Sequence, residues 1–156
     1  MIPSQELKEF RLFKDLDDSE LTQIAERCHE RNLKTGTICF MQGEKATDVR
    51  LCRKGKVNII IQLYEPWGME VKVHTATDGG VFGWASLVEP HTTTSSAICA
   101  EMVDEVYIKA SDLLELFEQN LHMGYVVMSN LSTIINSRLT EDRQRLSSKL
   151  NPDFKA

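Results

Sequence analysis

The spacing of apolar residues divides the chain into a helical beginning, a strand-rich middle and a helical end. After the acidic run at residues 17–20, apolar positions recur at intervals of three and four, which predicts a helix with one buried stripe. Carboxylates favour a helix start there because they accept hydrogen bonds from the free amides of the first turn. The stripe consists of Leu21, Ile24, Ala25 and Cys28. A shorter helix is expected over residues 4–10, and Phe10, Leu12, Phe13 and Leu16 should pack on the body.

From about residue 33 the apolar segments become short and are separated by turns that contain glycine. Alternation is clearest over residues 57–63, where Val57, Ile59 and Ile61 alternate with less apolar neighbours. Pro66 and Gly68 mark a hairpin tip before a return strand. The other expected strands cover residues 37–41, 49–52, 71–73, 96–100 and 105–108. Many short strands at this spacing predict an antiparallel sandwich or barrel.

A helical period returns at Ser111 and continues, after a short helix, through a long helix over residues 120–146. Its apolar positions are largely seven residues apart, which is typical of a helix that packs on another long helix. We therefore expect a homodimer formed through this helix, with packing on the protein's own barrel as the alternative. The seam consists of Leu121, Met128, Leu131, Ile135, Leu139 and Leu146. The expected organisation is a barrel with amino-terminal helices (1–118), a dimerisation or hinge helix (119–150) and a tail (151–156).

Composition narrows the class of protein. The chain has 156 residues, a formal net charge of −5 and four cysteines without paired spacing. The acidic balance argues against a nucleic-acid surface, and the basic run at residues 53–56 is interpreted as a solvated turn. Neither a signal peptide nor an apolar stretch of about 20 residues is visible. We therefore expect a cytoplasmic protein with reduced thiols and no membrane association.

Catalytic or metal chemistry is not expected. The four histidines show no ligand spacing, and no nucleophile lies in a recognisable pattern with a base. Cys28 and His29 are adjacent, but Cys28 falls on the apolar stripe, so it is interpreted as a core residue rather than a haem or metal ligand. Glu44 and Asp48 are interpreted as surface charges near a turn.

The segment GGVFGWASLVEPHTTTSSA, residues 79–97, has the composition of a loop that holds a small anion. It contains three glycines and a run of five hydroxyl side chains at residues 92–96, but no basic side chain. His91 is interpreted as exposed. An anion bound here would therefore depend on backbone amides and hydroxyl groups.

Four segments in order resemble the cyclic nucleotide-binding domain family, which includes the catabolite activator protein, kinase regulatory subunits and pacemaker channels. They are LFKDLDDSELTQIA at 12–25, GTICFMQGEKATDVRLCRKGKVNI at 36–59, GGVFGWASL at 79–87 and AEMVDEVYI at 100–108. The resemblance implies a mainly β fold, an antiparallel jelly-roll barrel (double-stranded β-helix) with amino-terminal helices and a long carboxy-terminal helix. It also identifies residues 79–97 with the family's phosphate-binding cassette, and we use the word cassette for them below.

The resemblance implies a cassette that has lost its two discriminating side chains. Gly83 stands at the family's glycine, Trp84 stands where a glutamate binds the ribose, and Thr94 stands where an arginine binds the cyclic phosphate. Loss of both would cost about 3 to 6 kcal/mol, which is about two to four decades of affinity. The expected ligand-binding residues are Gly83, Trp84, Ala85, Ser86, Leu87, Thr94, Ser95 and Ser96.

Three functional hypotheses follow. The first is a stand-alone regulatory module that senses a non-standard anionic ligand or docks to a separate effector protein, with weakened affinity for cyclic AMP and cyclic GMP. The second is a genuine cyclic nucleotide receptor with a relaxed cassette, and the third is a structural interaction protein whose pocket Trp84 closes. The candidate ligands are a cyclic nucleotide or another small phosphate or carboxylate anion. Only ten residues follow Leu146, so DNA binding by this chain is not expected.

Overall fold

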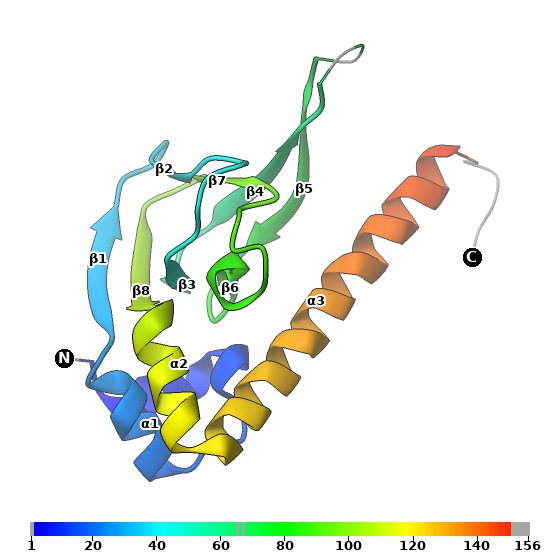
Figure 1. Ribbon diagram of the computed structural model, residues 1–156. Coiled ribbons are helices and arrows are strands. Elements are labelled where there is room, and N and C mark those ends of the chain that lie inside the picture. The colour runs from blue at the N-terminus through cyan, green and yellow to red at the C-terminus, as the bar shows by residue number, and fades with distance from the viewer. Residues whose placement is uncertain (1, 65, 67, 151–156) are drawn as a thin grey trace.

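Two antiparallel four-stranded sheets form the centre of the computed structural model, which describes residues 2–64, 66 and 68–150 (Figure 1). One sheet has the strand order β1-β8-β3-β6 and the other has the order β2-β7-β4-β5. This arrangement confirms the predicted mainly β jelly-roll barrel. The strands are β1 (His29–Leu33), β2 (Ile38–Phe40), β3 (Asp48–Lys54), β4 (Val57–Gln62), β5 (Glu70–Ala76), β6 (Val81–Gly83), β7 (Ser96–Cys99) and β8 (Val103–Lys109).

The amino-terminal segment consists of the 3₁₀ helices η1 (Ser4–Glu9) and η2 (Arg11–Phe13) and the α-helix α1 (Asp18–Ala25). A capping box starts α1 where the acidic run predicts it. The amide of Glu20 donates to Oδ1 of Asp17 at 2.8 Å, and the amide of Asp17 donates to Oε1 of Glu20 at 3.1 Å. Two otherwise unpaired backbone donors are satisfied in this way, so the helix begins at a defined residue.

Apolar side chains gather in two buried clusters. The first joins the amino-terminal helices and the start of the carboxy-terminal helix to the sheet that contains β3 and β8, and it includes the predicted stripe on α1. The second cluster includes Cys52, Val57, Ile59 and Phe82, from strands of both sheets. The alternating pattern predicted for β4 is therefore real, since Val57 and Ile59 are buried.

One strand was not predicted from the sequence, and one sequence-based interpretation is wrong. Residues 29–33 form β1, which was not predicted because its side chains are mostly polar and exposed. Arg53 does not lie in a solvated turn. Its guanidinium forms ion pairs with Asp104 at 2.9 Å, Glu6 at 2.9 Å and Glu30 at 2.6 Å. These contacts join the amino-terminal segment to β1, β3 and β8.

The carboxy-terminal part comprises α2 (Ala110–Gln119) and the long helix α3 (Leu121–Leu150), which runs diagonally beside the barrel in Figure 1. Leu131 and its neighbours Met123 and Val127 are buried against the protein's own core. By contrast, Leu139 and Leu146 of the predicted seam are 45% and 57% exposed. The first half of α3 therefore packs on its own domain. The predicted tail, 151–156, lies outside the described residues.

All four cysteines are free thiols. Burial raises the pKa values of Cys28, Cys39 and Cys52 to about 12, so these thiols stay protonated and unreactive at neutral pH. Within the described ranges, no cluster of three or more histidine, cysteine or acidic residues could hold a metal ion. No helix there has both the length and the apolarity needed to cross a membrane.

Candidate ligand-binding site

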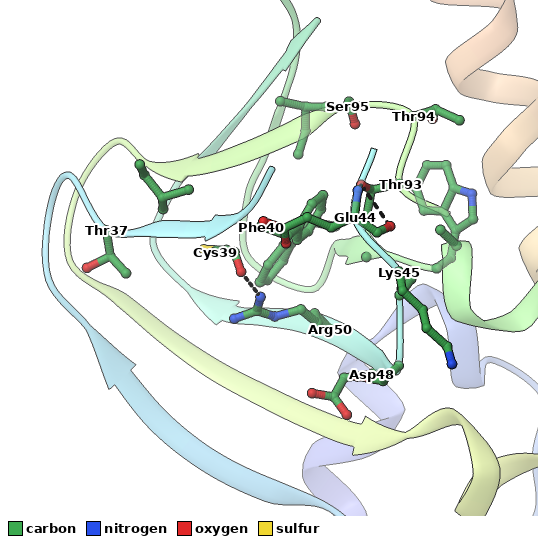
Figure 2. A pocket seen from close by; sticks show the side chains of 18 of the residues that line it. Thr37, Cys39, Phe40, Glu44, Lys45, Asp48, Arg50, Thr93, Thr94 and Ser95 are labelled. Atoms are coloured by element: carbon green, nitrogen blue, oxygen red, sulfur yellow. Dashed lines mark hydrogen bonds between the residues drawn. The ribbon is translucent and has the colours of Figure 1, made fainter. Parts of the chain in front are cut away.

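A cavity of about 450 Å³ opens between the β2–β3 segment, the cassette and α3. Figure 2 shows Phe40 of β2 and Thr93 of the cassette near the middle of the site, with Arg50 below them, whereas the side chain of Lys45 extends outward. The apolar wall is formed by Leu33, Ile38, Phe40, Ile59, Phe82 and Trp84. The charged lining residues are Arg31, Glu44, Lys45, Asp48, Arg50 and Arg138. A space of this size and mixed polarity suits a small organic molecule that carries a charge.

Arg50 is the central basic residue of the site, and its guanidinium is fixed by three hydrogen bonds. Its Nε and Nη2 donate to the two carboxylate oxygens of Glu105, the latter at 3.1 Å, and Nη1 donates to the carbonyl of Cys39 (Figure 2). Glu105 is 0% exposed and also accepts a hydrogen bond from Nε of Arg31 at 2.8 Å. One buried carboxylate therefore lies between two guanidinium groups. Arg31, Arg50 and Glu105 together carry one net positive charge.

The register of the sheet brings these three residues together. Glu105 on β8 is directly opposite Arg31 on β1, whereas Arg50 on β3 is opposite Tyr107, two positions along the same strand. Directly opposed and diagonal side chains on one face of an antiparallel pair are close enough to interact. The hydrogen bond with Glu105 raises the pKa of Arg31, so this guanidinium stays charged.

Gly83 allows the side chain of Arg50 to lie against the cassette strand. The two residues are paired between β3 and β6, and a Cβ added to Gly83 would lie 3.2 Å from both Cβ and Cγ of Arg50. Any larger side chain would push the arginine stem away from β6. The Arg50 guanidinium also lies 5.5 Å from the ring centroid of Phe82, which stacks on Phe40.

Trp84 links the cassette to the carboxy-terminal helix. It is half-buried and precedes η3 (Ala85–Leu87), the short helix of the cassette. The guanidinium of Arg138 lies 5.0 Å from the Trp84 ring centroid, and its Nη2 donates to the carbonyl of Val81 at 3.1 Å. Burial lowers the pKa of Arg138 to about 10, so the side chain still carries its charge at neutral pH.

Two hydroxyl side chains of the cassette hold the loop between β2 and β3. Oγ1 of Thr93 donates to the carbonyl of Met41 at 2.6 Å and accepts from the amide of Glu44 at 2.9 Å. Oγ of Ser96 accepts from the amide of Gln42 at 2.8 Å. Part of the hydroxyl run therefore has a structural role.

The predicted site residues fall into two groups. Gly83, Trp84, Ala85, Thr94 and Ser95 line the cavity. Ser86, Leu87 and Ser96 are buried and do not line it.

The interpretation of His91 as exposed is wrong. This residue is half-buried, and its Nδ1–H donates to the carbonyl of Ser86 at 3.0 Å. The contact joins two parts of the cassette, so the histidine holds the loop together.

The cassette contains no basic side chain, and the sequence-based expectation was that backbone amides and hydroxyl groups alone would hold an anion. Four basic residues from other elements line the cavity: Arg31, Lys45, Arg50 and Arg138. Sequence reasoning missed them because charged residues in strands and on an exposed helix are assigned to the surface by default. The available signal was the position of Arg50 between Val49 and Leu51, which are buried on the opposite face of β3.

Comparisons with known proteins agree with this geometry. The family profile described as cyclic nucleotide-binding domain matches residues 30–120. A solved structure from Geobacter metallireducens GS-15, described as a cyclic nucleotide-binding protein, is 31% identical, covers 89% of this chain and 99% of its own, and has a TM-score of 0.77. The chain belongs to the cyclic nucleotide-binding domain family. Members of this family are regulatory domains.

More distant members of the cyclic nucleotide-binding domain family share the fold. A domain from Methylobacillus flagellatus KT is 15% identical, with a TM-score of 0.78, and the alignment covers 97% of this chain and 82% of that one. The catabolite activator protein of Thermus thermophilus is 24% identical, with a TM-score of 0.72 and coverage of 88% and 62%. No curated protein matches the sequence significantly.

Proposed function

We propose that this chain is a regulatory module whose cavity binds a small organic anion other than a cyclic nucleotide. The charge and shape of the cavity carry the proposal. Four basic side chains and two carboxylates line it, and Phe40, Phe82 and Trp84 supply an apolar wall. A ligand with one anionic group and an apolar or planar body satisfies both features.

Weak affinity for cyclic AMP and cyclic GMP follows from the two cassette positions that differ from the family pattern. Thr94 is exposed at the cavity and offers a neutral hydroxyl where an arginine is expected. The indole of Trp84 can only donate a hydrogen bond, so it cannot replace a carboxylate that accepts one from a ribose hydroxyl. Arg50 does not compensate fully, since Glu105 already occupies two of its nitrogen donors.

Binding would be transmitted through the contact between Trp84 and Arg138. A ligand beside Trp84 would contact the guanidinium of Arg138, which belongs to α3. Ligand binding and the position of the helix therefore both depend on this side chain. The ligand can shift the equilibrium between two positions of α3 only by the difference between its affinities for the two positions.

A cyclic nucleotide receptor with a relaxed cassette is the second candidate, and family membership favours it. The third hypothesis, a pocket closed by Trp84, is disfavoured by the cavity beside the indole.

Titration calorimetry tests the choice between the first two candidates. We expect cyclic AMP and cyclic GMP to bind only in the millimolar range or more weakly, because both discriminating side chains are absent. A micromolar dissociation constant for either nucleotide would favour the receptor instead.

Mass spectrometry of the small molecules released from the purified, denatured protein should identify an anion. A Trp67→Phe variant leaves Trp84 as the single tryptophan, and the emission of Trp84 should change when that anion is added back.

We also propose that the chain forms a homodimer through the second half of α3, where Leu139 and Leu146 are exposed. Replacing both with aspartate should convert a dimer into a monomer in sedimentation velocity, because two buried apolar contacts would become charged. The variant with Thr140→Asp and Ser148→Asp is the control, since it adds the same charge at exposed positions of α3. A monomeric unaltered protein would refute this proposal.

A further inference from the structure

A second cavity, of about 340 Å³, lies where α3 meets the segment around η2 and the strands β5 and β6. We call it the junction cavity. Its charged lining residues are Arg11 and Lys14 from the amino-terminal segment and Arg138 and Glu141 from α3. Three cations against one carboxylate leave an excess of positive charge, although the whole chain has a net charge of −5.

The cations of the junction cavity have no carboxylate partner within the part of the chain that the structure describes. None of the ion pairs found there involves Arg11, Lys14 or Arg138. Glu141 instead pairs with Nδ1 of His74 at 3.0 Å. Burial is the main cause that lowers the pKa of Arg138, and the positive charge of Arg11 also lowers it, whereas the negative charges of Glu141 and Asp142 raise it. The junction cavity therefore concentrates positive charge that an anion would stabilise.

The backbone that carries Arg11 and Lys14 is held in place before any ligand arrives, and the two side chains themselves are exposed. Nδ2 of Asn130 donates to the carbonyl of Leu12 at 3.0 Å and to the carbonyl of Lys14 at 2.8 Å. These bonds fix the segment that carries Arg11 and Lys14 against α3. A ligand bound here would not need to order the backbone of this segment, which lowers the conformational entropy lost on binding.

We propose that the junction cavity binds a phosphate dianion, either free phosphate or a small phosphomonoester. Guanidinium groups bind phosphate oxygens through two parallel hydrogen bonds, and an ammonium group adds a third contact. The hydroxyls of Thr133 and Ser137 donate to helix carbonyls, so the basic side chains are the donors that face the cavity. The volume leaves room for a small organic group beside the phosphate.

Arg138 lines both cavities, and its guanidinium lies 5.0 Å from the centroid of the Trp84 ring. Phosphate bound to this guanidinium changes how it contacts the indole. The two ligands would then change each other's affinity by the same factor, as linkage requires. This coupling rests on the proposed function of the first cavity, whereas the phosphate site does not.

A nuclear magnetic resonance titration of the full chain with inorganic phosphate tests the site. At constant ionic strength set with chloride, the Nε–H signal of Arg138 should shift and saturate in the millimolar range. The double variant Arg11→Gln and Lys14→Gln should weaken phosphate binding at least about tenfold, because two charge-assisted contacts are lost. The double variant Lys34→Gln and Lys54→Gln is the matched control, since it removes two exposed positive charges that do not line the junction cavity and should change nothing. A second titration uses glycerol 3-phosphate. If glycerol 3-phosphate binds more tightly than inorganic phosphate, the ligand class is a phosphomonoester.

Three results would overturn the phosphate site. One is an unchanged dissociation constant in the Arg11→Gln, Lys14→Gln variant, and another is equal weakening by the Lys34→Gln, Lys54→Gln variant. The third is a shift confined to the amides of Thr94 and Ser95, which would place the anion in the first cavity. That last result would leave the proposed function intact, so the two proposals can fail separately.

Discussion

Replacing Trp84 with glutamate and Thr94 with arginine is expected to tighten the binding of cyclic AMP by about two to four orders of magnitude. The arginine restores a planar cation for the cyclic phosphate, and the glutamate restores an acceptor for the ribose hydroxyl. Together these contacts contribute about 3 to 6 kcal/mol, which converts to that change in affinity. Titration calorimetry of the double variant beside the unaltered protein measures the gain.

The control for this experiment is the pair Trp84→Glu and Thr92→Arg. Thr92 lies two positions from Thr94 in the same segment but does not line the cavity, so this variant has the same net charge without an arginine at the site. We expect only part of the gain from it. Equal affinities in the two variants would show that net charge, and not the position of the arginine, determines binding. No gain in either variant would show that the cavity does not hold the nucleotide as other family members do.

Glu105→Gln is expected to lower the free energy of unfolding by about 3 to 5 kcal/mol. The substitution keeps the shape of the side chain but removes the charge that pairs Arg31 with Arg50. The side chain of Arg50 is only 12% exposed, so its charge would remain without a compensating partner. For a chain of this length the melting temperature should fall by roughly 6 to 20 °C. Urea and thermal unfolding measure both quantities.

Glu115→Gln is the matched control for Glu105→Gln. It breaks the ion pair with Arg27 at 3.4 Å, in which the Glu115 side chain is 56% exposed. Because water screens exposed pairs, we expect a loss of no more than about 1 kcal/mol. Similar losses in the two variants would mean that the buried charge group contributes little to stability.

Elements with a strong apolar pattern could be predicted from the sequence. The helix after Asp17 and the strand β4 were placed correctly because burial of one face imposes a period that the residues reveal. The strand β1 carries the polar sequence HERNL and pairs along one edge with β8, so burial imposes no such period on it. Its position follows from backbone pairing, which leaves no trace in the side-chain pattern.

The candidate site was predictable only where it lies in one continuous segment. Gly83, Trp84 and Thr94 were found through the cassette, and all three line the cavity. The contact between Arg50 and Glu105 joins residues 55 positions apart, and it exists because of the register between β3 and β8. Sequence spacing does not specify that register. Arg138 was missed for a similar reason, since the direction in which α3 crosses the barrel decides what it meets.

The two parts of α3 are held on the rest of the protein by different kinds of contact. Fully buried apolar side chains hold the helix as far as Leu131, and Ile134 and Ile135 still pack partly on the core. Farther along, the contacts with the barrel include polar ones, such as that of Arg145 with the carbonyl of Lys72 at 3.1 Å. The part of α3 beyond Leu131 is about 28 Å long, at about 1.5 Å per residue. A tilt of the helix by about 10° at Leu131 would move its carboxy-terminal end by roughly 5 Å. If the proposed ligand moves the Arg138 guanidinium beside Trp84, a displacement of this size would be large enough for a neighbouring molecule to detect.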